Sequence, residues 1–216
     1  MTTKHPHSRI ILFAREPILG QVKTRLHPAI GQAGALGLYK AMLGRVTETL
    51  NSSQLANWEL CVTSNMSHKY FITLCNKRDI TLQVGTDLGQ RMSQAIAGGL
   101  GKEQVEKVLI IGSDCPAMSE DYIDSALTAL EEGNEVVLGP AEDGGYVLVG
   151  MSRQVPEIFE DMPWGSDQVL SQTLQRLEKL GVSYRLLAPL WDVDRPEDLA
   201  RLSELSPPLK QWDDPA

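Results

Sequence analysis

The chain has 216 residues and a net charge of −8 at neutral pH, with 42% hydrophobic and 22% charged residues. This length suits one well-buried domain, and the composition is that of an ordinary soluble globular protein. The acidic balance argues against nucleic acid as a partner, which would need a basic surface, and no apolar run reaches the ~20 residues that span a bilayer.

We therefore expect a single domain, residues 1–216, with a flexible N-terminus over residues 1–8 and an extended or disordered tail over residues 206–216. The three cysteines, Cys61, Cys75 and Cys115, form no close pair and no metal-ligand cluster. Two of them follow or lie in apolar runs, which favours buried free thiols and a cytoplasmic protein.

The first predicted strand, residues 9–14, is continuously apolar and is followed by the loop R-E-P-I-L-G-Q-V-K-T-R-L. A cationic turn after a strand suits an anionic ligand, because backbone N–H groups and side-chain cations converge on phosphate. The loop is not a P-loop, since Val22 and Pro17 stand where that motif needs glycines. An ordinary basic surface loop is the alternative. The candidates for nucleotide binding here are Ala14, Arg15, Gly20, Lys23, Thr24 and Arg25.

Helical spacing of apolar residues predicts a helix over residues 32–50, and residues 58–63 and 80–84 read as strands. Residues 70–75 are ambiguous between helix and strand. The motif G-T-D-L-G-Q-R-M follows, with Asp87 between two glycines. Asp87 is either the N-cap of the next helix or, with Gly89, a contact to a base or sugar, while Arg91 reaches a phosphate.

Residues 108–116, V-L-I-I-G-S-D-C-P, predict a strand that is buried on both faces and is then broken by Gly112 and Pro116. Asp114 follows this strand directly, at the place where open α/β sheets bind ligands. It is either a turn residue or a ligand contact. Ser113 beside it is a further candidate for nucleotide binding.

A helix is expected over residues 120–132, followed by strands over 135–138 and 147–149. The stretch between these strands, G-P-A-E-D-G-G-Y, is either a plain hairpin turn or a loop that faces a substrate. In the second case Asp143 is the candidate base or acceptor-orienting group. Gly144, Gly145 and Tyr146 are then candidates for substrate binding.

The segment P-W-G-S introduces a helix with Val169 to Leu177 on one face, and Ser166 is its expected N-cap. Trp164 is either a core residue or part of a lid that binds substrate. A late strand is expected over residues 183–187. In W-D-V-D-R-P-E-D-L, Asp194 and Glu197 have the spacing of a capping box.

Strands and amphipathic helices alternate along the chain, which predicts an α/β protein with a mostly parallel central sheet covered by helices on both faces. The motifs quoted for residues 15–26, 85–92, 110–116, 139–146 and 191–199 occur in an order that resembles a largely uncharacterised bacterial family, DUF2064, of GT-A-like nucleotide-diphospho-sugar transferases. The resemblance covers about residues 9 to 203.

The resemblance implies a Rossmann-like GT-A fold and an enzyme that binds a nucleotide-sugar and Mg²⁺ or Mn²⁺ and transfers the sugar to a small-molecule acceptor. It implies that Lys23 and Arg25 act at the phosphates and that Asp114 and Asp194 hold the metal, with Asp192 open as the alternative second ligand. Nucleotidyl transfer, as in the similar molybdenum-cofactor and phospholactate nucleotidyltransferases, and a non-catalytic nucleotide-binding module remain alternatives. A homodimer also remains open.

Overall fold

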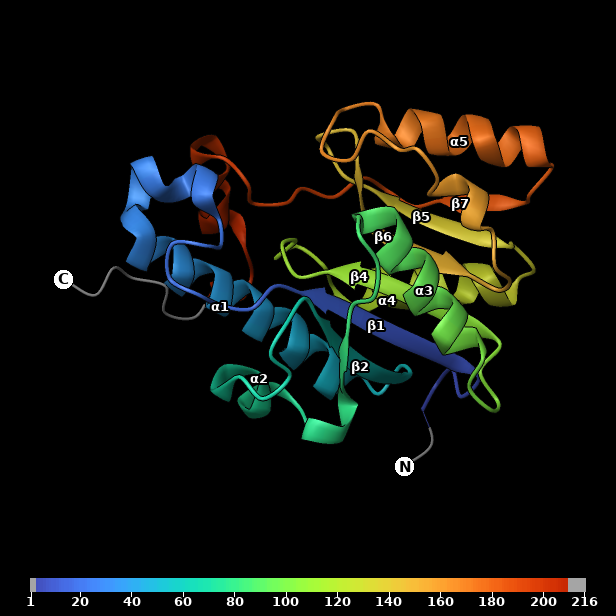
Figure 1. Ribbon diagram of the computed structural model, residues 1–216, viewed down its shortest axis with the longest axis horizontal. Helices are drawn as coiled ribbons and strands as arrows, with labels where there is room; N and C mark the ends of the chain where they lie inside the picture. The colour runs from blue at the N-terminus through green and yellow to red at the C-terminus, as the bar shows by residue number, and fades with distance from the viewer. Residues whose placement is uncertain (1–2, 210–216) are drawn as a thin grey trace.

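The computed structural model describes residues 3–209, and its apolar runs form one central sheet (Figure 1). The sheet has seven strands in the order β3-β2-β1-β4-β6-β5-β7. Among the described strands, β6 alone runs antiparallel to its neighbours, so the prediction of a mostly parallel α/β sheet is confirmed. The strands are β1 Ser8–Ala14, β2 Asn57–Val62, β3 Ile80–Leu82, β4 Lys107–Gly112, β5 Val136–Pro140, β6 Tyr146–Met151 and β7 Tyr184–Leu186.

Helices cover both faces of this sheet. The first core contains side chains of α1, α2 and α4, and the second contains side chains of α3 and α5. The α-helices are α1 His27–Ser53, α2 Lys69–Leu74, α3 Leu88–Leu100, α4 Glu120–Glu131 and α5 Val169–Leu180. Short 3₁₀ helices are η1 Thr24–Leu26, η2 Lys77–Asp79, η3 Pro156–Ile158 and η4 Pro196–Glu204. The central strands are apolar throughout because both of their faces are covered.

The structure resolves one open local prediction and corrects two others. The ambiguous residues 70–75 fall largely in helix α2. Helix α5 takes Gln168 as its N-cap, and the Ser166 hydroxyl instead accepts a hydrogen bond from the Gln168 N–H. The expected capping box at η4 is shifted by one residue: the carboxylate that accepts the backbone N–H groups of residues 194 and 195 is that of Asp198, not Glu197.

The N-terminal residues that the structure describes are held to the domain. The N–H groups of Lys4 and His5 donate to the carbonyls of Gln54 and Leu55, and the His5 ring is buried. The expectation of a flexible N-terminus is therefore wrong for residues 3–8. At the other end, Arg45 donates to the carbonyls of residues 206 and 207, and residues 1–2 and 210–216 lie outside the described residues.

All three cysteines are free, as predicted, and Cys61 and Cys115 are buried. Burial raises the pKa of the Cys115 thiol to about 12, so it stays protonated and unreactive. No helix within residues 3–209 combines the length and the apolarity that crossing a membrane requires.

The register of the sheet brings the loops of the predicted site to one edge. Phe13 of β1 lies beside Gly112 of β4, so the loops after these parallel strands begin next to each other. β5 ends and β6 begins at the same edge, where Pro140 pairs with Tyr146. Helix η4 (red in Figure 1) lies beside the N-terminal part of α1, where residues such as Leu38, Trp191 and Val193 form a third core.

Candidate active site

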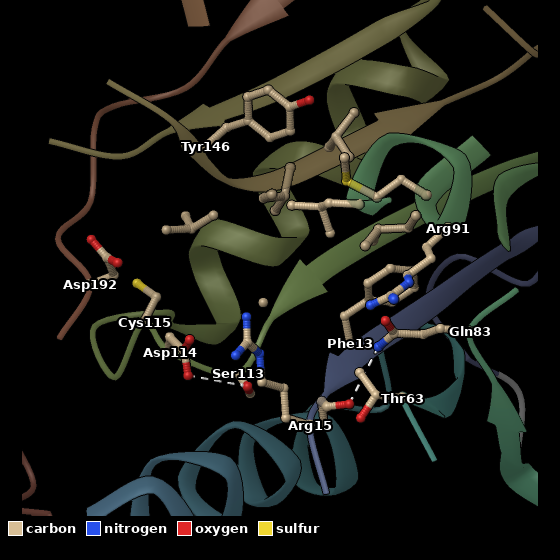
Figure 2. A pocket seen from close by; sticks show the side chains of 18 residues that line it. Phe13, Arg15, Thr63, Gln83, Arg91, Ser113, Asp114, Cys115, Tyr146 and Asp192 are labelled. Carbon is tan, nitrogen blue, oxygen red and sulfur yellow. Dashed lines mark hydrogen bonds between the residues drawn. The ribbon is translucent and has the colours of Figure 1, made fainter. Parts of the chain in front are cut away.

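A cavity of about 320 Å³ opens at this edge, and we call it the first cavity (Figure 2). Its walls come from the ends of β1 and β4, the start of β6, helix α3 and the extended segment before η4. It contains the predicted residues Ala14, Arg15, Arg91, Ser113, Asp114 and Tyr146, together with Asp192. Open α/β sheets bind ligands at this edge.

Asp114 stands at the mouth of the first cavity, just after β4. The Ser113 hydroxyl is buried and donates to Asp114 Oδ1 at 3.3 Å, while the Asp114 side chain remains 46% exposed. Its other oxygen, Oδ2, lies 3.0 Å from Lys23 Nζ. Asp114 is therefore more than a turn residue, because its side chain joins two segments that are distant in sequence.

Arg15 directs its guanidinium into the first cavity, toward Ser113 and Asp114 (Figure 2). Its backbone is fixed by Tyr39 of α1, whose hydroxyl accepts from Arg15 N at 2.7 Å and donates to Arg15 O at 2.8 Å. Burial raises the pKa of Tyr39, so this hydroxyl keeps its proton and both bonds. Tyr39 lies in the helix that apolar spacing predicts over residues 32–50, and this spacing indicates burial but not the partner of a hydroxyl.

The other two cations of the first loop do not line the first cavity. Lys23 has left-handed backbone angles, φ 49° and ψ 43°, and its side chain is only 5% exposed. Its ammonium donates to Val193 O at 2.6 Å as well as pairing with Asp114. Arg25 forms an ion pair with Asp194, and Thr24 is exposed. Gly20 has φ 77°, a conformation that glycine adopts readily.

The segment before η4 alternates between core and site. Trp191 and Val193 are buried, so Asp192 and Asp194 share the opposite face of this extended stretch. The N–H of Val193 donates to Asp114 O at 3.0 Å, which fastens the segment to the end of β4. Burial, and then the nearby carboxylates of Asp143 and Asp114, raise the pKa of Asp192 to about 6.

A second cavity of about 430 Å³ adjoins the first and shares Asp192 with it. Asp143 and Asp194 line this second cavity, and Arg25 faces it as well. Asp143 lies in the hairpin between β5 and β6, and its Oδ1 accepts the N–H of Gly145 at 2.9 Å. The predicted hairpin turn is thus present, and it also forms part of a cavity wall.

Gly144 and Tyr146 have packing roles at this hairpin. Gly144 has φ 90°, and a Cβ there would meet Asp167 O at 2.3 Å, so a close approach of two backbones requires glycine. The Tyr146 ring lines the first cavity, but its hydroxyl points away from Asp114 and is buried with no hydrogen-bond partner among the described residues (Figure 2). Burial raises the pKa of this hydroxyl.

Asp87, Gly89 and Trp164 lie outside both cavities. Asp87 caps α3 by accepting the Gln90 N–H at 2.9 Å, and Gly89 packs where a Cβ would meet Phe159 O at 2.5 Å. The Trp164 ring lies edge-on to Tyr146, in the manner of a core residue. These contacts account for the three residues through packing and capping, and their binding roles stay predictions.

Gln83 is a cavity residue that the sequence did not indicate. Its amide nitrogen donates to the carbonyls of Ala14 and Cys61, so its oxygen is left as the acceptor of the side chain. It follows β3 in the stretch that was read only as a strand end. A single glutamine in a short strand carries no signal for such a position.

Residues 46–166 match the family described as an uncharacterized protein conserved in bacteria (DUF2064). The chain belongs to the DUF2064 family. No curated protein matches its sequence. The family match covers the motifs around Asp87, Asp114 and Asp143, but not the first loop or Asp194.

Among solved structures, a candidate nucleotide-diphospho-sugar transferase from Desulfovibrio desulfuricans G20 is similar, with 28% identity and a TM-score of 0.84 over 91% of this chain and 86% of that one. CMP:2-keto-3-deoxy-manno-octonic acid synthetase, solved with CTP, shares the fold at 11% identity and a TM-score of 0.58, covering 93% and 98%. Rv0371C from Mycobacterium tuberculosis H37Rv, solved with manganese, does so at 15% and 0.54, covering 91% and 97%. The chain therefore has a fold that is also found in nucleotide-diphospho-sugar and nucleotidyl transferases.

Proposed function

We propose that this DUF2064 protein is a transferase that binds a nucleotide-diphospho-sugar with Mg²⁺ or Mn²⁺ and passes the sugar to a small-molecule acceptor. One observation carries the proposal: Arg15, Asp114 and Asp192 converge on a single cavity at the carboxyl edge of the sheet. The similarity to a candidate nucleotide-diphospho-sugar transferase over most of both chains supports the same class.

Arg15 is the cation best placed for the donor's diphosphate. Its guanidinium faces the first cavity, and it forms no ion pair with any described residue. The Tyr39 hydroxyl holds its backbone through both N–H and C=O, so the side chain starts from a fixed point. A preorganised arginine can bind two phosphate oxygens at once.

The carboxylates fit a divalent ion that completes its coordination with water and, when a nucleotide is bound, with phosphate oxygens. Within residues 3–209 no three His, Cys, Asp or Glu side chains form a complete metal cage. Mg²⁺ is commonly held by one or two carboxylates together with substrate phosphates, and Asp114 and Asp194 can supply these. When bound, the ion would neutralise the charge that develops on the leaving diphosphate. A fold neighbour solved with manganese supports this assignment.

We place the acceptor in the second cavity, because Asp192 lies on both cavities and so marks where donor and acceptor meet. An acceptor hydroxyl oxygen would attack the sugar's anomeric carbon, and the bond from that carbon to the diphosphate oxygen would break. Asp143 would accept the hydroxyl proton, and a nucleoside diphosphate would leave. The bond from Gly145 N–H fixes Asp143 for this task.

Nucleotidyl transfer is the second candidate, favoured by the synthetase of the same fold that was solved with CTP. In that reaction an acceptor oxygen attacks the α-phosphorus of a nucleoside triphosphate, and pyrophosphate leaves. The same cations and metal would serve, because both reactions place charge on a leaving diphosphate group. A non-catalytic nucleotide-binding module would use the same contacts without turnover.

The released product separates these three functions. The purified protein would be incubated with panels of sugar nucleotides and of nucleoside triphosphates, with Mn²⁺ and a mixture of small acceptors. Release of nucleoside diphosphate from a sugar nucleotide supports sugar transfer, whereas pyrophosphate from a triphosphate supports nucleotidyl transfer. Binding of one nucleotide with release of neither product would replace the enzyme by a binding module.

A further inference from the structure

Two cations of the first loop are bound to the two carboxylates that we assign to the metal. Lys23 pairs with Asp114, and Arg25 pairs with Asp194. The cations are two residues apart on one loop, whereas the carboxylates lie on segments 80 residues apart in the chain. Lys23 and Arg25 thus place positive charge on the same carboxylates that a divalent ion would bind.

The two pairs differ in burial, and only the Lys23 ammonium is shielded from water. The Lys23 side chain is 5% exposed, whereas that of Arg25 is 60% exposed. A buried ammonium is stable only with a counter-charge and filled hydrogen bonds, and Lys23 obtains these from Asp114 and the Val193 carbonyl. An exposed pair such as Arg25–Asp194 is screened by water and salt and contributes little.

A divalent ion on Asp114 and the Lys23 ammonium would repel each other strongly. The ammonium lies 3.0 Å from Asp114 Oδ2, so an ion on that carboxylate would stand within a few ångströms of a like charge. Such repulsion is relieved if the ammonium leaves the carboxylate. The open mouth of the first cavity beside Asp114 offers it the phosphates of the donor.

We infer that Lys23 is a built-in counter-cation that holds Asp114 in the metal-free protein and is displaced from it by the divalent ion. The displaced ammonium then becomes available to a phosphate oxygen, so metal binding and nucleotide binding favour each other. In the metal-free protein Lys23 positions Asp114, and in the metal-bound protein it contacts a phosphate. The inference rests on one part of the proposed function, namely that a divalent ion binds at Asp114.

The test measures Mn²⁺ binding in the absence of nucleotide, from the free-ion electron paramagnetic resonance signal and from thermal unfolding. Lys23→Gln removes the charge and keeps an N–H donor for the Val193 carbonyl. Lys179→Gln is the control, because it removes the same charge from an exposed position in the last turn of α5, outside both cavities.

Lys23→Gln should bind Mn²⁺ at least about ten-fold more tightly than the wild type, since the competing charge is gone. It should melt at a lower temperature without metal and show a larger upward shift with Mn²⁺. Lys179→Gln should change Mn²⁺ affinity by no more than about two-fold. If Lys23→Gln does not fold, Lys23→Met is measured in its place.

Equal or weaker Mn²⁺ binding by the Lys23 variant would overturn the inference, and so would an absence of Mn²⁺ binding in every variant. Neither result depends on turnover, which the product assay measures separately. If the variants bind Mn²⁺ as expected but the product assay detects no transfer, the inference about Lys23 stands and the proposed reaction is rejected.

Discussion

An ion pair with a buried member lies near each end of the sheet, and the two pairs differ in how exposed the carboxylate is and in how many cations contact it. Near the amino end, Glu59 of β2 is 7% exposed and is bound by two cations, Arg9 and Lys102. At the carboxyl edge, Asp114 is 46% exposed and has one cation, Lys23. The buried carboxylate near the amino end is over-compensated and closed off, whereas the one at the carboxyl edge remains open.

The difference separates a structural ion pair from a site. Arg9 reaches Glu59 through both Nε and an NH2 group, at 3.1 and 2.6 Å, so these bonds are already used within the protein. Among residues 3–209, the Asp114 side chain receives only a 3.3 Å bond from Ser113 besides its contact with Lys23. A carboxylate that keeps exposed oxygen next to a cavity can accept a ligand, whereas one buried between two cations is closed to it.

The largest effect is expected at the closed end. Glu59→Gln leaves two cations without their shared carboxylate and should lower the free energy of unfolding by about 3–5 kcal/mol, as broken buried pairs do. Urea unfolding measures this loss. Glu106→Gln, which breaks an exposed pair with Lys107, is the control and should change stability by less than about 1 kcal/mol. If both variants lose equally little, Glu59 does not stabilise the fold in this way.

The next effect concerns the open end. Asp114→Asn should lower the rate of group transfer by ~10²–10³, by analogy with the loss of one electrostatic stabiliser. It should also abolish the stabilisation by Mn²⁺ plus nucleotide. Without ligands the variant should lose about 1–2 kcal/mol, because Lys23 stays buried without its counter-charge, discounted for the exposure of Asp114. A variant that keeps the full metal-dependent rise in melting temperature would remove Asp114 from the site.

The strands and helices could be predicted from the sequence because the signals for them are local. Continuous apolar runs predict the strands β1 and β4, and three- and four-residue spacing predicts α1, α4 and α5, each with its boundary shifted by a few residues at most. The capping errors at Ser166 and Glu197 arise because several neighbouring side chains can accept the same N–H. The choice between them depends on the direction of chain entry, which a sequence does not specify.

Site residues could be predicted from the sequence only where they follow a predicted strand. Asp114, Arg15 and Asp143 follow strands, so their common edge follows from a parallel sheet. The pairing of Lys23 with Asp114 could not be predicted, because it depends on how two loops, with 91 residues from one partner to the other, meet in space. The sequence offers Asp192 only as an alternative to Asp194, since nothing in W-D-V-D tells which aspartate lines the first cavity as well as the second.

A smaller effect tests whether the loops at the carboxyl edge are as tightly packed as the opposite end. Gly144→Ala places a methyl group against the Asp167 backbone at φ 90° and should cost about 2 kcal/mol of stability. Gly98→Ala is the matched control, because a Cβ there meets nothing within 4 Å and α3 favours alanine, so stability should rise by about 0.5–1 kcal/mol. Urea unfolding compares the two. Equal stabilities for both variants would mean that the hairpin yields easily.

The smallest effect is a pH dependence of stability at the carboxyl edge, where Asp192 is partly buried. Asp192 has its pKa raised from 3.8 to about 6, first by burial and then by Asp143 and Asp114. Because the folded state prefers the protonated acid, its stabilising contribution is complete below about pH 4 and is lost as the pH rises through 6. Asp192→Asn does not ionise and should escape this loss.

The metal-free Asp192→Asn variant should therefore gain stability relative to the wild type as the pH rises from about 4 to 7. The shift sets an upper limit near 3 kcal/mol, and partial exposure of Asp192 reduces the expected gain to about 1–2 kcal/mol. Urea unfolding in the presence of a chelator, at a series of pH values, measures the difference. Glu103→Gln, an exposed carboxylate in the turn after α3, should give a curve parallel to that of the wild type. If the Asp192→Asn curve is parallel as well, Asp192 is as well solvated as a surface acid, and the carboxyl edge then stores no charge repulsion for a metal to relieve.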